Sequence, residues 1–215
     1  MKARRTAPGK ALQVYRSKRD FAKTREPRGR RRGARPELAY VIQKHDASHL
    51  HFDLRLEMDG VMKSWAVPKG PSVNPAVKRL AVQVEDHPIE YNTFEGIIPQ
   101  GEYGGGTVMI WDRGSWRFGG DDPDPKRGIR EGLRLGKLEI VLEGRRLRGG
   151  WVLVRTGKQG SKPQWLLIKQ RDRHAGHGPE PVERFTRSVV TRRTMSGIAA
   201  HAEQPARGGN NERRD

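Results

Sequence analysis

The sequence predicts a mainly β fold, either a barrel or a sandwich, with only short helical turns. Many short segments alternate apolar and polar residues, and glycine-containing turns separate them about every 8–12 residues. Hydrophobic residues make up 33% of the 215-residue chain and charged residues 32%, which allows one core that does not use every residue. We expect an ordered domain over residues 37–172. A largely flexible basic arm (residues 1–36) should precede it, and a disordered tail (residues 173–215) should follow it.

Each expected strand follows from period-two alternation between turn residues. Asp59-Gly60 is the usual sequence of a two-residue hairpin turn and links the second strand to the third. Short helices are expected over residues 12–21 and 128–134. The expected strands are Leu38–Lys44, His49–Glu57, Val61–Val67, Arg79–Glu85, Thr107–Trp111, Ser115–Gly119, Lys137–Leu142, Gly149–Arg155 and Gln164–Lys169.

The net charge of +18 is concentrated in the N-terminal arm. Residues 1–36 contain fourteen Lys or Arg and two acids, whereas residues 37–169 contain twenty against seventeen. A basic arm gains affinity for a phosphate backbone by releasing counterions, although such a segment can also be only a solvated tail. The absence of cysteine excludes disulfides and thiol nucleophiles. No apolar run approaches the roughly 18 residues needed to cross a bilayer, and we expect a cytoplasmic bacterial protein.

The segment from Gln43 to Arg55, QKHDASHLHFDLR, carries the clearest chemical signal. Strand geometry places His49, His51, Asp53 and Arg55 on one face and apolar residues on the other. His45 can join them if the chain bends at residues 46–48. Two histidines and a carboxylate form a ligand set for a divalent transition metal, and an adjacent arginine suits phosphate. The spacing favours a metal or phosphate site over a solvated strand face, with His49 at its rim as a non-ligand.

A second cluster, Glu85-Asp86-His87-Pro88, follows the strand that begins at Arg79. His87 could act as a general acid or donate to a phosphate oxygen. Nearby in sequence, Lys69, Arg79 and Tyr91 supply two cations and a phenol. The glycine run at 104–106 lacks a following Gly-Lys-Ser/Thr, so a hairpin turn is favoured over a phosphate loop. The three later histidines are expected at the surface: His174, His177 and His201.

Four motifs together resemble a known family. They are QKHDASHLHFDLRLEMDGVMKSWAVPKGPS, KRLAVQVEDHPIEY, FEGIIPQGEYGGGTVMIWDRG and the late WLLIK. In this order they are similar to the 3′-phosphoesterase domain of bacterial DNA ligase D, from about Tyr15 to Arg171. The resemblance implies a compact closed β-barrel with a crescent-shaped groove. It also implies manganese-dependent healing of DNA 3′ ends in non-homologous end joining: removal of a terminal ribonucleoside, then of the 3′-phosphate, to leave a 3′-OH.

The resemblance also assigns roles to residues. Metal ligands would be His45, His51 and Asp53, while His87, Arg55 and Tyr91 would engage the scissile phosphate. The arm would serve chiefly the ribonucleoside-removing step. Its expected functional residues are Arg19, Asp20 and Glu26, and the residues expected to line the same pocket are Gln43, Lys69, Arg79 and Glu85.

Several expectations about activity and partners accompany this resemblance. The chain lacks a Lys-x-Asp-Gly adenylation motif, so it should not ligate DNA and should be a free-standing form of the module. Expected partners are primer–template 3′ ends, including 3′-ribonucleotide ends, with a separate ligase or polymerase as a further candidate; the protein should be a monomer without membrane contact. Imidazole and carboxylate also accept Co²⁺ and Zn²⁺. The alternative function is a non-catalytic module that binds DNA ends and recruits a ligase.

Overall fold

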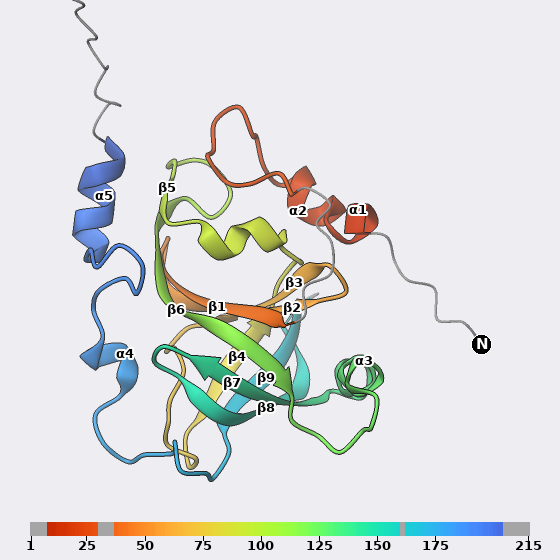
Figure 1. The fold of residues 1–215 in the computed structure, drawn as a ribbon. Coiled ribbons are helices and arrows are strands. Elements are labelled where there is room, and N and C mark those ends of the chain that lie inside the picture. The colour runs from red at the N-terminus through yellow and green to blue at the C-terminus, as the bar shows by residue number, and fades with distance from the viewer. Residues whose placement is uncertain (1–7, 30–36, 160–161, 204–215) are drawn as a thin grey trace, which may run out of the picture.

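A computed structural model describes residues 8–29, 37–159 and 162–203, and its main body is a closed antiparallel β-barrel (Figure 1). Eight strands form the ring in the order β1-β2-β3-β4-β9-β8-β7-β6, and β6 pairs again with β1. The predicted barrel is therefore confirmed. The strands are β1 (Leu38–Asp46), β2 (Leu50–Met58), β3 (Val61–Val67), β4 (Lys78–Gln83), β5 (Gly96–Ile98), β6 (Gly106–Phe118), β7 (Lys137–Gly144), β8 (Arg148–Gln159) and β9 (Lys162–Lys169).

Strand β6 closes the barrel and is one continuous strand of 13 residues, not the two strands expected. One of its edges pairs with β1, and the other pairs with β5 and then with β7. The sequence Asp-Arg-Gly at 112–114 separates the two expected strands, but a bulge at Trp111, opposite the step from Ile42 to Gln43, keeps β6 paired with β1. Asp112 then lies buried and accepts bonds from the Tyr40 hydroxyl and from the Leu147 amide. Because its oxygens are satisfied inside the fold, the strand continues.

The core fills the inside of the barrel with aromatic and branched side chains. All five tryptophans are buried there: Trp65, Trp111, Trp116, Trp151 and Trp165. On β2 the inward positions are Phe52, Leu54 and Leu56, so the alternate positions face outward, as the alternation predicted. The β2–β3 hairpin turns at Asp59 and Gly60, whose φ angles of 49° and 83° are both positive, as a type I′ turn requires. This turn fixes the register of the strand that carries the candidate site.

The longest helix is α3 (Pro125–Leu135), which extends beyond the predicted 128–134 at both ends. Its amino end is capped by the Asp124 carboxylate, and Gly136 ends it in the left-handed conformation. Among the residues that the structure describes, no helix is long and apolar enough to span a membrane. The shorter helices are α1 (Pro8–Ala11), α2 (Gln13–Ser17), the 3₁₀ helix η1 (Ile89–Thr93), α4 (Pro181–Arg184) and α5 (Met195–Glu203).

Both terminal segments differ from the expected flexible arm and tail where the structure describes them. Tyr15 is completely buried and packs with Leu12 against Val61 and Tyr91, so residues 8–29 lie on the barrel. At the other end, Val189 is buried against the outer face of the sheet. The average composition of the two segments did not predict this packing. Each segment contributes only a few apolar side chains, and the barrel provides the surface that buries them. The expectations for residues 1–7, 30–36 and 204–215 lie outside the described residues.

Candidate metal and phosphate site

Three candidate ligands converge because of the register between β1 and β2. His45 lies opposite His51, and Gln43 lies opposite Asp53. One ligand atom from each of His45, His51 and Asp53 lies within 4.8 Å of the other two. The loop at residues 46–48 is therefore the bend that the sequence required. These residues could hold a metal ion, and the site faces the outside of the barrel.

Hydrogen bonds to two backbone carbonyls determine which ring nitrogen of each histidine remains available to a metal. Nε2 of His45 lies 2.8 Å from the Gly104 carbonyl, and Nδ1 of His51 lies 2.9 Å from the His49 carbonyl. A carbonyl only accepts hydrogen bonds, so each of these nitrogens carries a proton. The other two nitrogens, Nδ1 of His45 and Nε2 of His51, lie 3.6 Å from the two Asp53 oxygens. Such carbonyl contacts orient the histidines of protein metal sites, so the donor set fits a metal.

Asp53 is buried and ionised. Burial raises the pKa of its carboxyl, but the Arg55 guanidinium holds that pKa well below its usual range. Nη2 of Arg55 donates to Asp53 Oδ2 at 2.9 Å. The carboxylate thus offers negative charge to a cation without first losing a proton at neutral pH.

Arg55 is held in place and retains an unused donor. Its Nε donates to Gln43 Oε1 at 2.8 Å, and its guanidinium lies 4.7 Å from the centre of the Tyr91 ring. Gln43 is fixed in turn by donating to the carbonyls of Tyr91 and Phe94. Nη1 of Arg55 is buried without a partner in the described chain. A buried guanidinium nitrogen without an acceptor is costly, and a phosphate oxygen beside Asp53 would satisfy it.

The N-terminal arm adds a second buried group beside the first. Nε of Arg19 donates to Glu26 Oε1 at 2.8 Å, and the Tyr91 hydroxyl donates to the same oxygen at 2.8 Å. The side chains of Arg19 and Glu26 are only 4% and 1% exposed, so this pairing is protected from solvent. Arg19 also contacts Glu85 at 3.4 Å and Nε2 of His87 at 3.4 Å. The arm is therefore part of the site's wall.

His87 is neutral in the folded chain. Burial, reinforced by the positive charges of Arg55 and Arg19, lowers its pKa well below 6.5. Its Nδ1 lies 2.9 Å from the Glu85 carbonyl and must donate to it, which leaves Nε2 as an acceptor facing Arg19. Burial, together with the charge of Glu26, raises the pKa of Tyr91 well above 10, so the phenol stays protonated.

Three of the predicted site residues lie apart from this group. The Asp20 side chain is 48% exposed and accepts a turn bond from the Ala22 amide. Lys69 is exposed just after the end of β3. Arg79 pairs with Glu180 of the C-terminal segment at 2.8 Å. The structure brings together the other ten predicted residues: Arg19, Glu26, Gln43, His45, His51, Asp53, Arg55, Glu85, His87 and Tyr91.

Several contacts of the site went unnoticed in the sequence. Lys18 pairs with Glu85 at 3.0 Å and donates to the Tyr103 hydroxyl, and Thr24 donates to Glu26. Gly104 offers His45 only a carbonyl and holds φ at +78°, which favours glycine. Its place in a glycine-rich turn was the one available signal. The others depend on contacts between residues far apart in sequence, so no local pattern indicates them.

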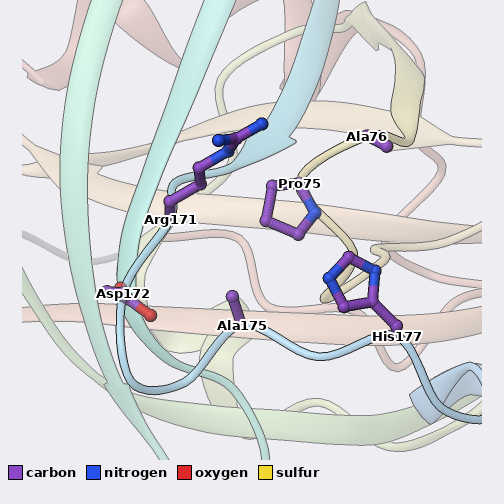
Figure 2. A pocket seen from close by; sticks show the side chains of 6 residues that line it. All are labelled: Pro75, Ala76, Arg171, Asp172, Ala175 and His177. Carbon is purple, nitrogen blue, oxygen red and sulfur yellow. The ribbon is translucent and has the colours of Figure 1, made fainter.

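A cavity of about 660 Å³ lies elsewhere, between the segment before β4 and the segment after β9 (Figure 2). Its lining residues are Pro75, Ala76, Arg171, Asp172, Ala175 and His177. Asp172 accepts from the Gly150 amide and pairs with Lys169, so the one carboxylate in its wall is already engaged. None of the candidate ligands lines this cavity.

Comparison with known families identifies the relatives of this site. Residues 43–155 match the family model described as the DNA ligase D 3′-phosphoesterase domain. The chain belongs to this phosphoesterase family. The matched residues run from β1 into β8 and include the three candidate metal ligands.

Curated relatives of the phosphoesterase domain agree with this assignment. The chain is 50% identical over 212 residues to the multifunctional non-homologous end joining protein LigD of Pseudomonas aeruginosa, and the match covers 93% of the chain. It is 38% identical to LigD of Mycobacterium bovis over 88% of the chain, and 41% identical to LigD of Mycolicibacterium smegmatis over 75%. The matches span 24%, 23% and 21% of these relatives, so the chain corresponds to about a quarter of their length.

Proposed function

We propose that this chain is a metal-dependent phosphoesterase that heals DNA 3′ ends in non-homologous end joining. It would remove a 3′-terminal ribonucleoside and then the 3′-phosphate, leaving a 3′-OH. The observation that carries the proposal is the convergence of the three candidate ligands beside an arginine with a free, buried Nη1. A cation and a guanidinium donor side by side suit a phosphate ester.

His45, His51 and Asp53 are the residues that would hold the metal. The mixed imidazole and carboxylate donors suit Mn²⁺, the metal that we propose, and also accept Co²⁺ or Zn²⁺. A metal bound there would polarise a phosphoryl oxygen and lower the pKa of a bound water. The hydrogen bonds to the Gly104 and His49 carbonyls support this assignment, because they keep one nitrogen of each histidine free.

The protein's own residues would bind and orient the phosphate. Arg55 would donate from Nη1 to a phosphate oxygen, while Gln43 and Asp53 hold the rest of its guanidinium. His87, neutral in the free protein, would become a donor once a phosphate's negative charge raises its pKa. Tyr91 would donate its hydroxyl hydrogen after exchanging Glu26 for the substrate. Arg19 and Glu26 would hold this arrangement against the barrel.

The remaining assignments rest on family membership. The matched LigD proteins are named for non-homologous end joining, so we propose primer–template 3′ ends as substrates and a separate ligase or polymerase as a partner. Asp20, Lys69 and Arg79 would contact substrate away from the metal, since their side chains lie outside the buried group. We place the activity in the cytoplasm of a bacterium, with a monomer as the working unit.

The test uses two primer–templates, one ending in a single 3′ ribonucleotide and one in a 3′-phosphate, incubated with Mn²⁺. We expect the parent to process both and His45→Ala to lose activity by at least about 100-fold, since it removes a metal ligand. His49→Ala is the matched control. His49 is exposed, and its backbone carbonyl, which orients His51, survives the substitution.

Two outcomes would overturn the proposal. If the parent protein processes neither end, it lacks the proposed phosphoesterase activity. If His45→Ala and His49→Ala both match the parent, the three ligands are not the site. Tight binding of DNA ends without processing, unchanged in Asp53→Ala, would instead support the non-catalytic module that recruits a ligase.

A further inference from the structure

A cluster of arginines lies outside the proposed metal site and forms no ion pair in the part of the chain that the structure describes. The segment Arg184–Arg193 contains four arginines and no acid, and the turn between β7 and β8 adds others. We define the arginine cluster as Arg145, Arg146, Arg187, Arg192 and Arg193. Within residues 8–29, 37–159 and 162–203, none of these five forms an ion pair with a carboxylate; the partners of three of them are backbone carbonyls.

The cluster is held together although its members repel one another. Arg145 donates to the Val189 carbonyl at 2.6 Å, and Arg146 donates to the Arg187 carbonyl at 2.5 Å. The Arg146 guanidinium lies over the Phe185 ring at 4.8 Å, and its buried Nη1 has no hydrogen-bond partner among the described residues. Burial lowers the pKa of Arg146, the nearby Asp112 carboxylate opposes this shift, and the charge of Arg192 lowers the pKa further. Five positive charges with only the Asp112 carboxylate acting on one of them are unfavourable in the free protein and favourable toward an anion.

The turn that carries the cluster is fixed to the barrel. The Val189 amide donates to the Ile110 carbonyl at 3.0 Å, and the Ser188 amide donates to the Arg193 carbonyl at 2.8 Å. Arg192 adopts φ = 64°, a left-handed conformation that an arginine rarely takes. Strained residues of this kind persist where the surrounding structure requires them, and they gather at ligand-binding sites. The exposed Arg187 and Arg192 side chains are therefore presented from a set position.

The cluster lies on the same outer face as the candidate ligands. Val189 packs on Val41 and Ile110, and Ile110 lies opposite Gln43 of β1. Val41 and His45 are on one face of β1, four residues apart, which corresponds to about 13 Å. Along a DNA strand, with about 3.4 Å per nucleotide, that distance is roughly four base pairs. In Figure 1 the segment leading to α5 runs along the side of the barrel opposite α3.

We propose that the arginine cluster binds backbone phosphates of the duplex part of a primer–template, roughly four base pairs or more from the 3′ end. This inference rests on the proposed function, because the metal site sets where the 3′ end lies. The contacts would be with phosphate alone, so the cluster would add affinity without reading sequence. It gives the C-terminal segment a role in holding the duplex, while the N-terminal arm closes the site.

The test compares two double variants with equal loss of charge. R187Q/R192N removes two exposed members of the cluster, and asparagine tolerates the left-handed conformation at 192. R127Q/R130N is the control on α3, where each arginine pairs with a nearby aspartate. Binding is measured with hairpin DNAs that end in a 3′-OH and are closed by an uncharged linker, so no turnover occurs. Their stems have about 3 or about 14 base pairs, below or beyond the span to the cluster.

With the long stem, we expect R187Q/R192N to flatten the slope of log K against log salt by about two, since each lost phosphate contact removes about 0.9. Affinity should fall at least about tenfold at 0.1 M salt, while the control changes little. With the short stem the two variants should bind equally. Thermal unfolding of both variants establishes that each is folded.

The proposal is overturned if the two variants bind the long stem equally, which is also the result expected if the cluster serves an acidic protein. An equal loss on both stems overturns the assignment to the distant duplex. Removal of a 3′-phosphate by the parent is assayed separately. A parent without that activity would refute the proposed function, while a length-dependent binding defect would still establish the surface.

Discussion

Arg19 and His87, 68 residues apart in sequence, meet in the site with Nη2 of the arginine 3.4 Å from Nε2 of the histidine. The contact brings a cation from the N-terminal arm against a buried imidazole. It helps to keep that imidazole neutral, because Arg19 and Arg55 both disfavour a proton on His87. The arm therefore acts on the chemistry of the barrel as well as covering it.

The neutral state of His87 predicts an acid sensitivity of the fold. Because the folded pKa is lowered, the unfolded chain binds a proton below about pH 6.5 that the folded chain does not. The unfolding free energy should therefore decrease as the pH is lowered, by up to about 1.4 kcal/mol per pH unit from this residue. His87→Gln should remove this part of the slope. Urea unfolding of parent and variant between pH 7.5 and 5 measures it, because the other titrating groups are common to both proteins, and equal slopes would contradict the prediction.

Glu26 should be essential for the attachment of the arm. Glu26→Ala removes the closer of the two buried carboxylates that pair with Arg19 and leaves the Tyr91 hydroxyl without its acceptor, which should cost about 3–5 kcal/mol of unfolding free energy. Asp20→Ala is the comparison in the same arm: its half-exposed carboxylate makes a turn bond, so the loss should be about 1 kcal/mol or less. Chemical denaturation of both variants measures the difference. Similar losses would show that the buried pairing does not stabilise the arm.

Asp53 should dominate metal affinity. Asp53→Asn removes the charged ligand, so the affinity for Mn²⁺ should fall by at least about 100-fold. His49→Ala, at the exposed neighbouring position, should bind Mn²⁺ like the parent. Titration calorimetry provides the affinities, and stabilisation of the fold by added Mn²⁺ gives a second readout. Unchanged binding in Asp53→Asn would remove this carboxylate from the site.

Val189 and Val190 form a natural pair for testing the C-terminal segment. Val189 is 4% exposed on the outer face of the sheet, whereas Val190 is 42% exposed. Val189→Ala should cost about 1–2.5 kcal/mol of unfolding free energy through lost burial and the cavity left behind. Val190→Ala should change it by less than about 0.5 kcal/mol. Thermal or urea unfolding distinguishes them, and equal effects would mean that this segment does not pack on β1 and β6 in solution.

Much of the barrel could be predicted because alternation is a local property. The expected third strand, Val61–Val67, matches the structure residue for residue, and most others differ by a few residues at their ends. The errors share a cause in tertiary contacts. Asp112 falls between two expected strands, but the Tyr40 hydroxyl bonds its carboxylate and a bulge at the neighbouring Trp111 keeps β6 paired with β1, so the strand is continuous. The short β5 and the helix η1 have too few residues for a periodic signal.

The candidate ligands were predictable for the same reason. His51 and Asp53 share a strand face whatever the rest of the fold does, and one antiparallel partner with a short loop brings His45 opposite them. Arg79 was expected to line the same pocket, but it pairs with Glu180, a residue in a segment that looked disordered. Adjacency in sequence did not predict which cations reach the site.

By itself, the sequence determined the strand faces, the hairpin turn at Asp59-Gly60 and the grouping of His51, Asp53 and Arg55, since all of these depend on neighbours within a few residues. Only the tertiary structure decided which segments are ordered, which nitrogens of His45 and His51 stay free, and that His87 is neutral. These properties depend on burial and on the field of distant charges. Both arise only when the barrel closes and the terminal segments pack on its outer face.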